Sequence, residues 1–354
     1  MGCIYMDCAA VDLFCGVGGL THGVENAGIK VVAGIDLDAS CRYAYERNNK
    51  AKFINKGIEN ISSNEIEKLY PDNSIKILMG CAPCQPFSNY SLRYIKDGQK
   101  DDKWKLLYYF ANHVEIIRPH IVSMENVPQL SKEPVFTDFV SKLKSCGYFV
   151  SWDIVNCADY GTPQKRNRLV LLASLLASIT IIKPLFSKDN YVTVRNAIGE
   201  LSPLADGEIY GNDTLHKTSK LSSVNKKRIQ QSHPGGTWQD WDANLQLPCH
   251  KKQTGNGYRS VYGRMEWDKP SPTITTQFYG YGNGRFGHPE QDRAISLREG
   301  ALLQSFPLDY DFLDNETPQT TRKIGVHIGN AVPVKLAEAI GKSILEHIQQ
   351  REAE

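Results

Sequence analysis

The chain has 354 residues and a formal net charge of +2, which excludes a polycation and leaves nucleic-acid contact to a local basic surface. Its length can bury a large core and predicts two lobes. Nine scattered cysteines, no signal peptide and no apolar run of about 18 residues predict free thiols, a cytoplasmic location and no membrane span.

The first half of the chain alternates short apolar runs with amphipathic stretches. Strands are expected at 9–14, 30–35, 75–79, 120–124, 148–156 and 168–173, and helices at 20–27, 39–48, 104–118 and 136–145. This alternation is typical of an α/β fold with a doubly wound parallel sheet. Residues 190–290 are instead rich in Gly, Pro, Ser, Thr, Asn and aromatic residues, which predicts a smaller lobe of loops and short strands. A further amphipathic helix is expected at 334–350.

A glycine-rich turn follows the first predicted strand. Residues 12–19 read Asp-Leu-Phe-Cys-Gly-Val-Gly-Gly and open the first helix, where glycines let a ligand approach the backbone. Asp36 ends the next strand, where a carboxylate usually binds ribose hydroxyls. The turn lacks the third glycine of dinucleotide binders, and it is not followed by the Gly-Lys-Ser/Thr that binds triphosphates. The pattern therefore indicates a nucleoside-containing cofactor and favours S-adenosylmethionine over NAD or ATP.

Three reactive groups fall at the ends of predicted strands. Cys84 follows the strand at 75–79, Glu125 follows the strand at 120–124, and Arg166 and Arg168 lead into the last strand. Cysteine is a strong nucleophile when its thiolate is accessible. Because open α/β sheets place their chemistry at one edge, a thiol, a carboxyl and a guanidinium are expected to converge there.

Each of these groups also has a plainer interpretation. Cys81 and Cys84 could be a redox pair or half of a zinc site, Glu125 a helix cap, and Arg166 and Arg168 surface charges. The chain has no second cysteine pair at ligand spacing, so no metal site is expected. The joint order of the clusters favours a catalytic site.

Taken together, these motifs resemble the DNA (cytosine-5)-methyltransferase family. The matching blocks, in family order, are Asp-Leu-Phe-x-Gly-x-Gly-Gly at 12–19, Pro-Cys-Gln at 83–85, Glu-Asn-Val at 125–127, Gln-x-Arg-x-Arg at 164–168, Arg-Glu-Gly-Ala with Gln-Ser-Phe-Pro at 298–307, and Ile-Gly-Asn-Ala-Val-Pro at 328–333. They span nearly the whole chain, and six blocks in order are highly specific.

The resemblance implies methyl transfer from S-adenosylmethionine to C5 of a cytosine. Cys84, followed by Gln85, would attack C6 of the base, and Glu125 would hold N3 protonated. Arg168 would contact O2 of the base, with Arg166 supporting the site. A base inside a duplex cannot reach the thiol, so the target must flip out of the stack.

The resemblance also assigns the cofactor contacts and the domains. Phe14 would lie against the adenine and Asp36 on the ribose. The other expected cofactor residues are Gly16, Gly18, Gly19, Leu37, Pro83, Leu106, Asn330 and Val332. The chain departs from the family at Gly57, where an aspartate usually lies near the adenine amine, which leaves Glu59 or a backbone carbonyl as the alternative acceptor. Residues 1–188 with 318–354 would form the catalytic domain, and 189–317 the target-recognition domain.

The expected substrate is a short specific sequence in double-stranded DNA. The residues expected to contact it are Ser88, Gln164, Asn256, Gly257, Arg259 and Thr275. Such enzymes act as monomers, with a cognate restriction endonuclease acting separately. One alternative is a transfer-RNA cytosine methyltransferase on the same scaffold, although the Cys-Phe-Thr signature of that branch is missing here. Another is a non-catalytic DNA-binding homologue.

Overall fold

The computed structural model describes residues 7–83, 104–253, 255–314 and 319–352. The chain forms two compact units. The first contains Met1–Tyr160, Asn167–Leu185 and Val332–Glu354, and the second contains Gly161–Arg166 and Phe186–Ala331. Among the described helices, none is both long and apolar enough to cross a membrane.

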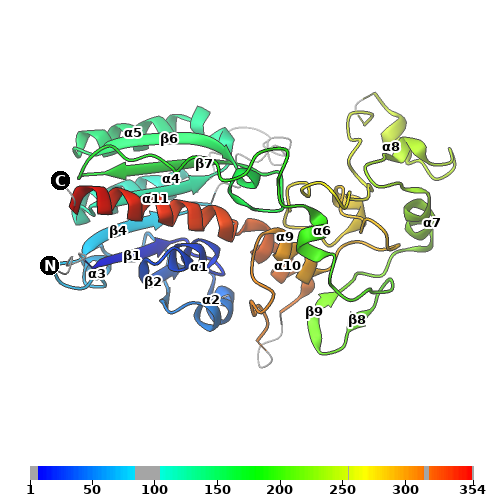
Figure 1. Ribbon diagram of the computed structural model, residues 1–354, viewed down its shortest axis with the longest axis horizontal. Helices are drawn as coiled ribbons and strands as arrows, with labels where there is room; N and C mark the ends of the chain where they lie inside the picture. Colours follow the sequence, from blue (N-terminus) through cyan, green and yellow to red (C-terminus); the bar gives the residue numbers. More distant parts are fainter. Residues whose placement is uncertain (1–6, 84–103, 254, 315–318, 353–354) are drawn as a thin grey trace. The chain divides into compact units, whose positions relative to one another are not determined.

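The first unit is built on a seven-stranded sheet with the order β3-β2-β1-β4-β5-β7-β6 (Figure 1). Its strands are β1 (Cys8–Leu13), β2 (Lys30–Asp36), β3 (Lys52–Asn55), β4 (Ile75–Gly80), β5 (Ile121–Asn126), β6 (Phe149–Asn156) and β7 (Asn167–Ser174). Its helices are α1 (Gly19–Asn26), α2 (Arg42–Asn48), α3 (Ser63–Glu67), α4 (Trp104–Ile117), α5 (Pro134–Ser145) and α11 (Val334–Glu352). The predicted α/β class is confirmed, while β3 and α3 were not predicted.

One strand departs from the fully parallel sheet that the sequence suggested. β1 to β5 pair in parallel, but β7 is antiparallel to both β5 and β6. The prediction was wrong here because β6 and β7 are joined only by a 3₁₀ turn (Cys157–Tyr160) and six further residues. A parallel connection needs a crossover of a dozen or more residues. The reversal brings the first residues of β7 beside the last residues of β5.

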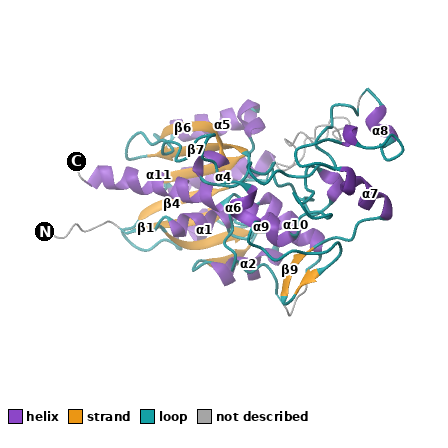
Figure 2. Ribbon diagram, turned by 45° about the vertical axis from the view of Figure 1, so that its right-hand side comes forward, coloured by secondary structure: helices purple, strands orange, loops and turns teal. Residues whose placement is uncertain are grey.

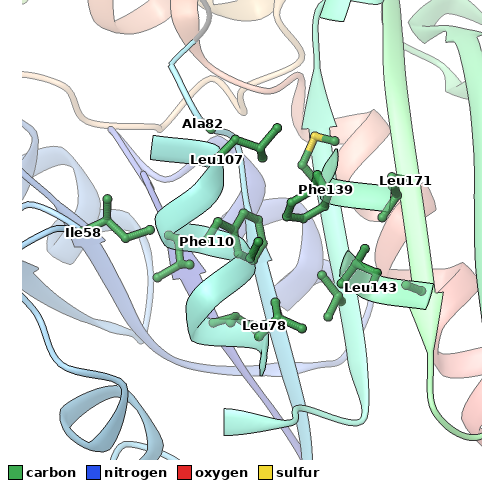
Figure 3. Close-up of a cluster of buried hydrophobic side chains, with 14 of the residues drawn as sticks. Ile58, Leu78, Ala82, Leu107, Phe110, Phe139, Leu143 and Leu171 are labelled. Carbon is green, nitrogen blue, oxygen red and sulfur yellow. The ribbon is translucent and has the colours of Figure 1, made fainter. Parts of the chain in front are cut away.

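An apolar core lies between the sheet and the helices α4 and α5. Figure 3 shows Phe110 of α4 and Phe139 of α5 over Leu78 and Leu171 of the strands. The two phenylalanine rings are fully buried, with their centroids 5.4 Å apart. Truncating such a residue to alanine costs about 3–5 kcal/mol. This core fixes the strand ends on which the polar residues lie.

α11 packs against α1, so the C-terminal helix belongs to the first unit. The approach is close because α1 carries a glycine at the crossing. A Cβ on Gly23 would lie 2.4 Å from the Cβ of Ala337. Any larger residue at position 23 would therefore push the two helices apart.

The second unit consists mainly of loops and short elements (Figure 2). These are α6 (Val194–Ile198), β8 (Ile209–Tyr210), β9 (Asp213–Lys217), α7 (Ser223–Gln231), α8 (Pro248–Lys251), α9 (Leu297–Leu303) and α10 (Thr321–Asn330). α10 and residues 161–166 group with this unit, whereas the predicted domain boundary assigned both to the catalytic part. Arg166 explains the grouping, since it donates to Ile274 O and Gly329 O. The predicted functional division of the chain stays a prediction.

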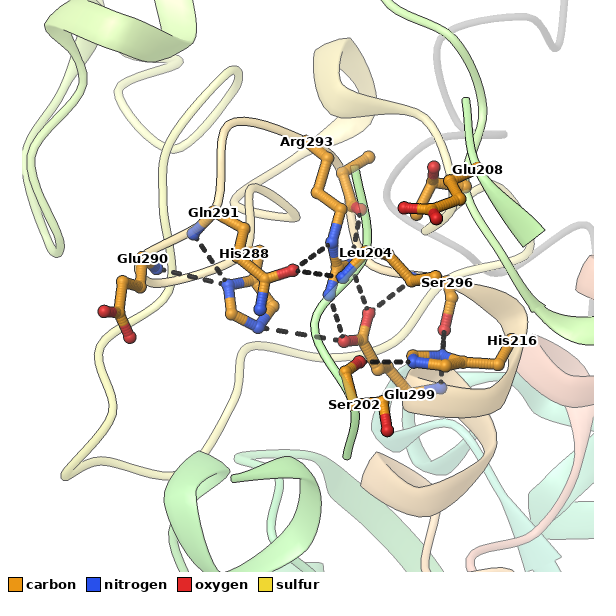
Figure 4. A network of polar contacts seen from close by, with 12 residues as sticks. Ser202, Leu204, Glu208, His216, His288, Glu290, Gln291, Arg293, Ser296 and Glu299 are labelled. Atoms are coloured by element: carbon orange, nitrogen blue, oxygen red, sulfur yellow. Dashed lines mark hydrogen bonds and ion pairs between the residues drawn. The ribbon is translucent and has the colours of Figure 1, made fainter. Parts of the chain in front are cut away.

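Buried polar contacts stabilise much of the second unit (Figure 4). Arg293 donates two hydrogen bonds to the fully buried Glu299, at 2.8 and 2.7 Å. His288 lies 3.8 Å from the same carboxylate. The nearby Arg264 donates to His288 O and pairs with Asp292. Such a network is stable only when its members are paired, which makes it sensitive to single substitutions.

Candidate active site

The predicted carboxyl and guanidinium lie together at one end of the sheet. Glu125 is near the end of β5, and β7 begins one residue before Arg168. In the antiparallel register Asn126 faces Leu169, so the side chains of Glu125 and Arg168 project from neighbouring strand ends. Arg168 Nε lies 2.8 Å from Glu125 Oε1, and their side chains are only 12% and 3% exposed. Burial of this pair strengthens its electrostatic interaction relative to a surface pair.

The segment that follows β4 forms hydrogen bonds with Glu125 and with its neighbour Asn126. Cys81 Sγ donates to Glu125 Oε2 at 2.8 Å, and Asn126 Nδ2 donates to Ala82 O at 3.1 Å. The sequence predicts Cys81 only as a partner of Cys84 in a redox pair or zinc site, and this contact with Glu125 was not predicted. Its signal was its place as the first residue after β4, beside β5, the strand that carries Glu125. The predicted residues Cys84, Gln85 and Ser88 lie outside the described residues.

The turn after β1 is fixed by the carboxylate at the end of β2. Phe14, Gly16 and Gly18 all have positive φ, at 61°, 51° and 91°. Asp36 Oδ2 accepts the Gly16 N–H at 2.8 Å, and Oδ1 accepts the Asp38 N–H at the same distance. For Phe14 this backbone conformation is strained and needs the surrounding structure to hold it. Asp36 therefore orders the glycine turn in addition to its predicted ribose contact.

A buried polar cluster of Asp12, Thr21 and Tyr45 lies beside that turn. Asp12 is fully buried and accepts from Thr21 Oγ1 at 2.7 Å, while Thr21 lies 3.0 Å from Tyr45 Oη. Burial raises the pKa of Asp12 to about 8, with the nearby Asp36 adding to the shift. Asp12 is thus neutral at pH 7. Its Oδ1 atom has no hydrogen-bond partner among the described residues.

The surroundings of the turn fit a nucleoside-containing ligand. A Cβ on Gly16 would meet nothing within 4 Å, so the space over the turn is open. Leu37, next to Asp36, is 68% exposed and offers an apolar surface of the kind that a base covers. Asn55 Nδ2 donates to the carbonyls of Asp36 and Leu37 and fixes their backbone.

The remaining predicted cofactor residues have different surroundings. Pro83 is exposed, Leu106 packs partly buried against the core, and Val332 is buried at the start of the last segment of the first unit. Asn330 is exposed and belongs to the second unit. Near Gly57, where the family usually has an aspartate, a Cβ would lie 2.4 Å from Glu59 Oε1. The carboxylate of Glu59 therefore fills the space that a side chain at position 57 would take.

Gln164 and Arg166 organise the second unit from within. Gln164 Nε2 donates to Gln304 Oε1 at 2.9 Å, and its Oε1 accepts the Ile274 N–H at 2.8 Å. Arg166 Nη1 donates to Ile274 O at 2.8 Å. Gln164 is fully buried and its amide is engaged with protein, which argues against its predicted contact with DNA. Both residues instead hold the stretch that leads to Thr275.

The other residues expected to contact DNA are exposed in the second unit. Asn256, Gly257, Arg259 and Thr275 all lie at the surface. Asn256 Oδ1 accepts from Gln239 Nε2 at 3.0 Å, and a Cβ on Gly257 would meet nothing within 4 Å. These residues are therefore accessible to a partner.

Comparison with known proteins identifies the family. The C-5 cytosine-specific DNA methylase family model matches residues 8–346. The chain is 52% identical to the Type II methylase M.HgiDII of Herpetosiphon aurantiacus, across 97% of this chain and 98% of that protein. It is 33% identical to the Type II methyltransferase M1.BsuMI of Bacillus subtilis, across 92% and 78% of the two chains.

Solved structures show the same fold at low sequence identity. A putative prophage-encoded DNA modification methyltransferase from E. coli has a TM-score of 0.71 at 20% identity, covering 96% of this chain and 99% of that chain. The S. pombe Dnmt2 methyltransferase has a TM-score of 0.63 at 18% identity, with coverages of 97% and 99%. The predicted family is confirmed: this chain belongs to the C-5 cytosine-specific DNA methylases and is a DNA methyltransferase of the restriction–modification type.

Proposed function

We propose that the enzyme methylates C5 of a flipped-out cytosine in a short specific sequence of double-stranded DNA, through a covalent bond between Cys84 and C6. The observation that carries this proposal is the buried Glu125, paired with Arg168 beside the segment that leads to Cys84. A carboxyl and a guanidinium held together in this way suit recognition of a planar base with adjacent donors and acceptors.

The residues divide the chemistry among them. The Cys84 thiolate adds to C6 of the base, and the electrons of the C5–C6 double bond become available at C5 for bonding to the methyl carbon. Glu125 donates a proton to, or shares one with, N3, so that negative charge does not accumulate on the ring. Arg168 contacts O2 of the base. Loss of the C5 proton then expels Cys84 and restores the double bond.

The cofactor is S-adenosylmethionine, which supplies an electrophilic methyl group when bound. We assign the glycine turn, Phe14 and Asp36 to its nucleoside portion, because the turn is open and ordered by the carboxylate. We assign Glu59 to the adenine amine, because its carboxylate takes the place of a side chain at position 57. A carboxylate oxygen there accepts the hydrogen bond that an exocyclic amine donates.

Target recognition is assigned to the second unit, whose exposed Asn256, Gly257, Arg259 and Thr275 are suited to contact DNA. Asn256 would fill the space that the flipped base leaves. We expect the enzyme to act as a monomer in the cytoplasm, with a cognate endonuclease acting separately. The Type II relatives favour DNA over the transfer-RNA alternative, and the presence of both Cys84 and Glu125 favours catalysis over a non-catalytic homologue.

Bisulfite sequencing tests the reaction and the target together. The wild type and Cys84→Ala are expressed separately in a bacterial host free of cytosine methylation. A recurrent short motif protected by the wild type alone is the expected result, with S-adenosylmethionine binding retained in the variant. Protection that persists in Cys84→Ala would refute the covalent mechanism. If the wild type folds and binds S-adenosylmethionine but protects no motif, DNA alone is not its substrate.

Exchange of the second unit tests where specificity resides. Residues 190–290 are replaced by the equivalent segment of a relative that protects a different motif. The protected motif is expected to change to that of the donor, since base contacts from this segment specify it. An unchanged motif in an active hybrid would place recognition elsewhere.

A further inference from the structure

We propose that Cys81 is a positioning residue for Glu125, holding the carboxyl in its reactive orientation through the thiol. This inference rests on the proposed role of Glu125 in base recognition. Cys81 Sγ lies 2.8 Å from Glu125 Oε2, and Arg168 Nε lies 2.8 Å from Glu125 Oε1. The two oxygens of the buried Glu125 carboxyl are thus contacted from both sides of β5. Arg168 reaches Oε1 from β7, and Cys81 reaches Oε2 from the end of β4.

A thiol is chemically suited to this place. It donates weakly to a carboxylate oxygen, and its sulfur accepts weakly from a protonated carboxyl. Glu125 is proposed to share its proton with the base, so its neighbour has to tolerate both protonation states. A permanently charged group at position 81 would favour one state, and an aliphatic group would leave Oε2 without this contact.

The backbone around Cys81 is held without the thiol. Its N–H donates to Leu13 O at 3.3 Å, and Asn126 Nδ2 holds the carbonyl of Ala82. Without the sulfur, these two hydrogen bonds still hold the backbone of residues 81 and 82 in place. For this reason the role of the thiol can be separated from a purely structural role.

The test compares Cys81→Ala, Cys81→Val and Cys81→Ser with the wild type. Valine fills the volume without a hydrogen bond, and serine restores a donor and acceptor. We expect kcat to fall about three- to tenfold in the alanine and valine variants, the loss typical of one hydrogen bond. The serine variant recovers most of the rate, and KM for S-adenosylmethionine is unchanged throughout. Cys146→Ala, at the other end of the first unit between α5 and β6, is the matched control.

An infrared measurement provides a readout that does not need activity. The S–H stretching band of Cys81, isolated as the difference between wild type and Cys81→Ser, is expected to shift when Glu125 is replaced by Gln. Equal kcat in all Cys81 variants, a serine variant as slow as alanine, or an S–H band unaffected by Glu125→Gln would each overturn the inference. An inactive wild type with the shifted band would instead refute the proposed function and leave the thiol contact standing.

Discussion

In the first unit, the candidate functional groups lie at strand ends beside an apolar core, whereas in the second unit the polar cluster around Glu299 is bonded within itself. Glu125 is contacted by Arg168 and Cys81 at the edge of a sheet whose packing is made by rings such as Phe110. Glu299, in the first turn of α9, is enclosed by the loop residues Arg293 and His288. The first arrangement leaves polar groups available for chemistry, and the second uses them to stabilise the fold.

The sharpest test of this contrast is to neutralise each buried glutamate in turn. Glu125→Gln is expected to lower kcat by about 10²–10⁴-fold, because the amide keeps the shape but cannot share a proton with the base. Thermal stability should fall less than in Glu299→Gln, because the side chain of Arg168 is 12% exposed to solvent whereas that of Arg293 is 1% exposed. Single-turnover methyl transfer measures the rate, with the exposed Glu115→Gln as control. A rate within tenfold of the wild type would contradict the assigned role.

Glu299→Gln should have the opposite profile. It leaves Arg293 and its charge buried without a carboxylate, which costs about 3–5 kcal/mol. Urea unfolding followed by tryptophan fluorescence is weighted toward the second unit, which holds Trp238, Trp241 and Trp267, while the first unit holds Trp104 and Trp152. We expect that transition to move to lower urea while the transition of the first unit stays in place. A loss below about 1 kcal/mol would mean that the network contributes little.

The two units should also respond to pH in opposite directions. Burial lowers the pKa of His288 to about 4, so the folded second unit resists protonation that the unfolded chain accepts. Its stability is expected to fall as pH drops from about 6.5 through 4, by up to about 3 kcal/mol. Burial raises the pKa of Asp12 to about 8, so the folded first unit keeps a proton that the unfolded chain releases. Its stability should fall as pH rises from about 4 through 8.

Substitutions by neutral residues check both signs. His288→Gln should reduce the loss of stability that the second unit shows as pH falls. Asp12→Asn should reduce the loss of stability that the first unit shows as pH rises. Urea midpoints at a series of pH values provide the measurement. If Asp12→Asn left the pH dependence of the first unit unchanged, the carboxyl would not be neutral in the folded state.

The same contrast explains what the sequence could predict. Alternating periodicity located the strands of the first unit, and motif order located Glu125 and Arg168. The reversal of β7 was missed because apolar strands look alike in either direction, although this reversal is what brings Arg168 beside Glu125. The Arg293–Glu299 network was also missed. Its partners are joined by loop geometry, which leaves no period in the sequence.

The contact of Cys81 was missed, and the choice between Glu59 and a backbone carbonyl near Gly57 was left open, for a related reason. Each of these two side chains contacts a residue at the end of another strand or beside a turn, and single-sequence patterns carry no such distances. Adjacent strand order was needed to place Cys81 against Glu125. The position of the Glu59 carboxylate over Gly57 depends on the local turn after β3.

The smallest expected effect concerns Glu59, at the border between the ordered sheet and its loops. Glu59→Ala should weaken S-adenosylmethionine binding about three- to tenfold, because the adenine amine loses one acceptor at a partly solvated position. Isothermal titration calorimetry measures the affinity, and Glu67→Ala, whose carboxylate pairs with Lys76, is the matched control.

A double substitution tests whether a carboxylate at position 57 can replace the carboxylate of Glu59 in binding the adenine amine. Gly57→Asp alone would place its Cβ against Glu59 Oε1, at 2.4 Å before any adjustment, and should weaken binding. Combined with Glu59→Ala, the same aspartate takes the vacated space and should restore affinity, because one carboxylate again faces the amine. If the double variant bound no better than Glu59→Ala, the amine would have another acceptor, and the carboxylate of Glu59 would serve only the turn around Gly57.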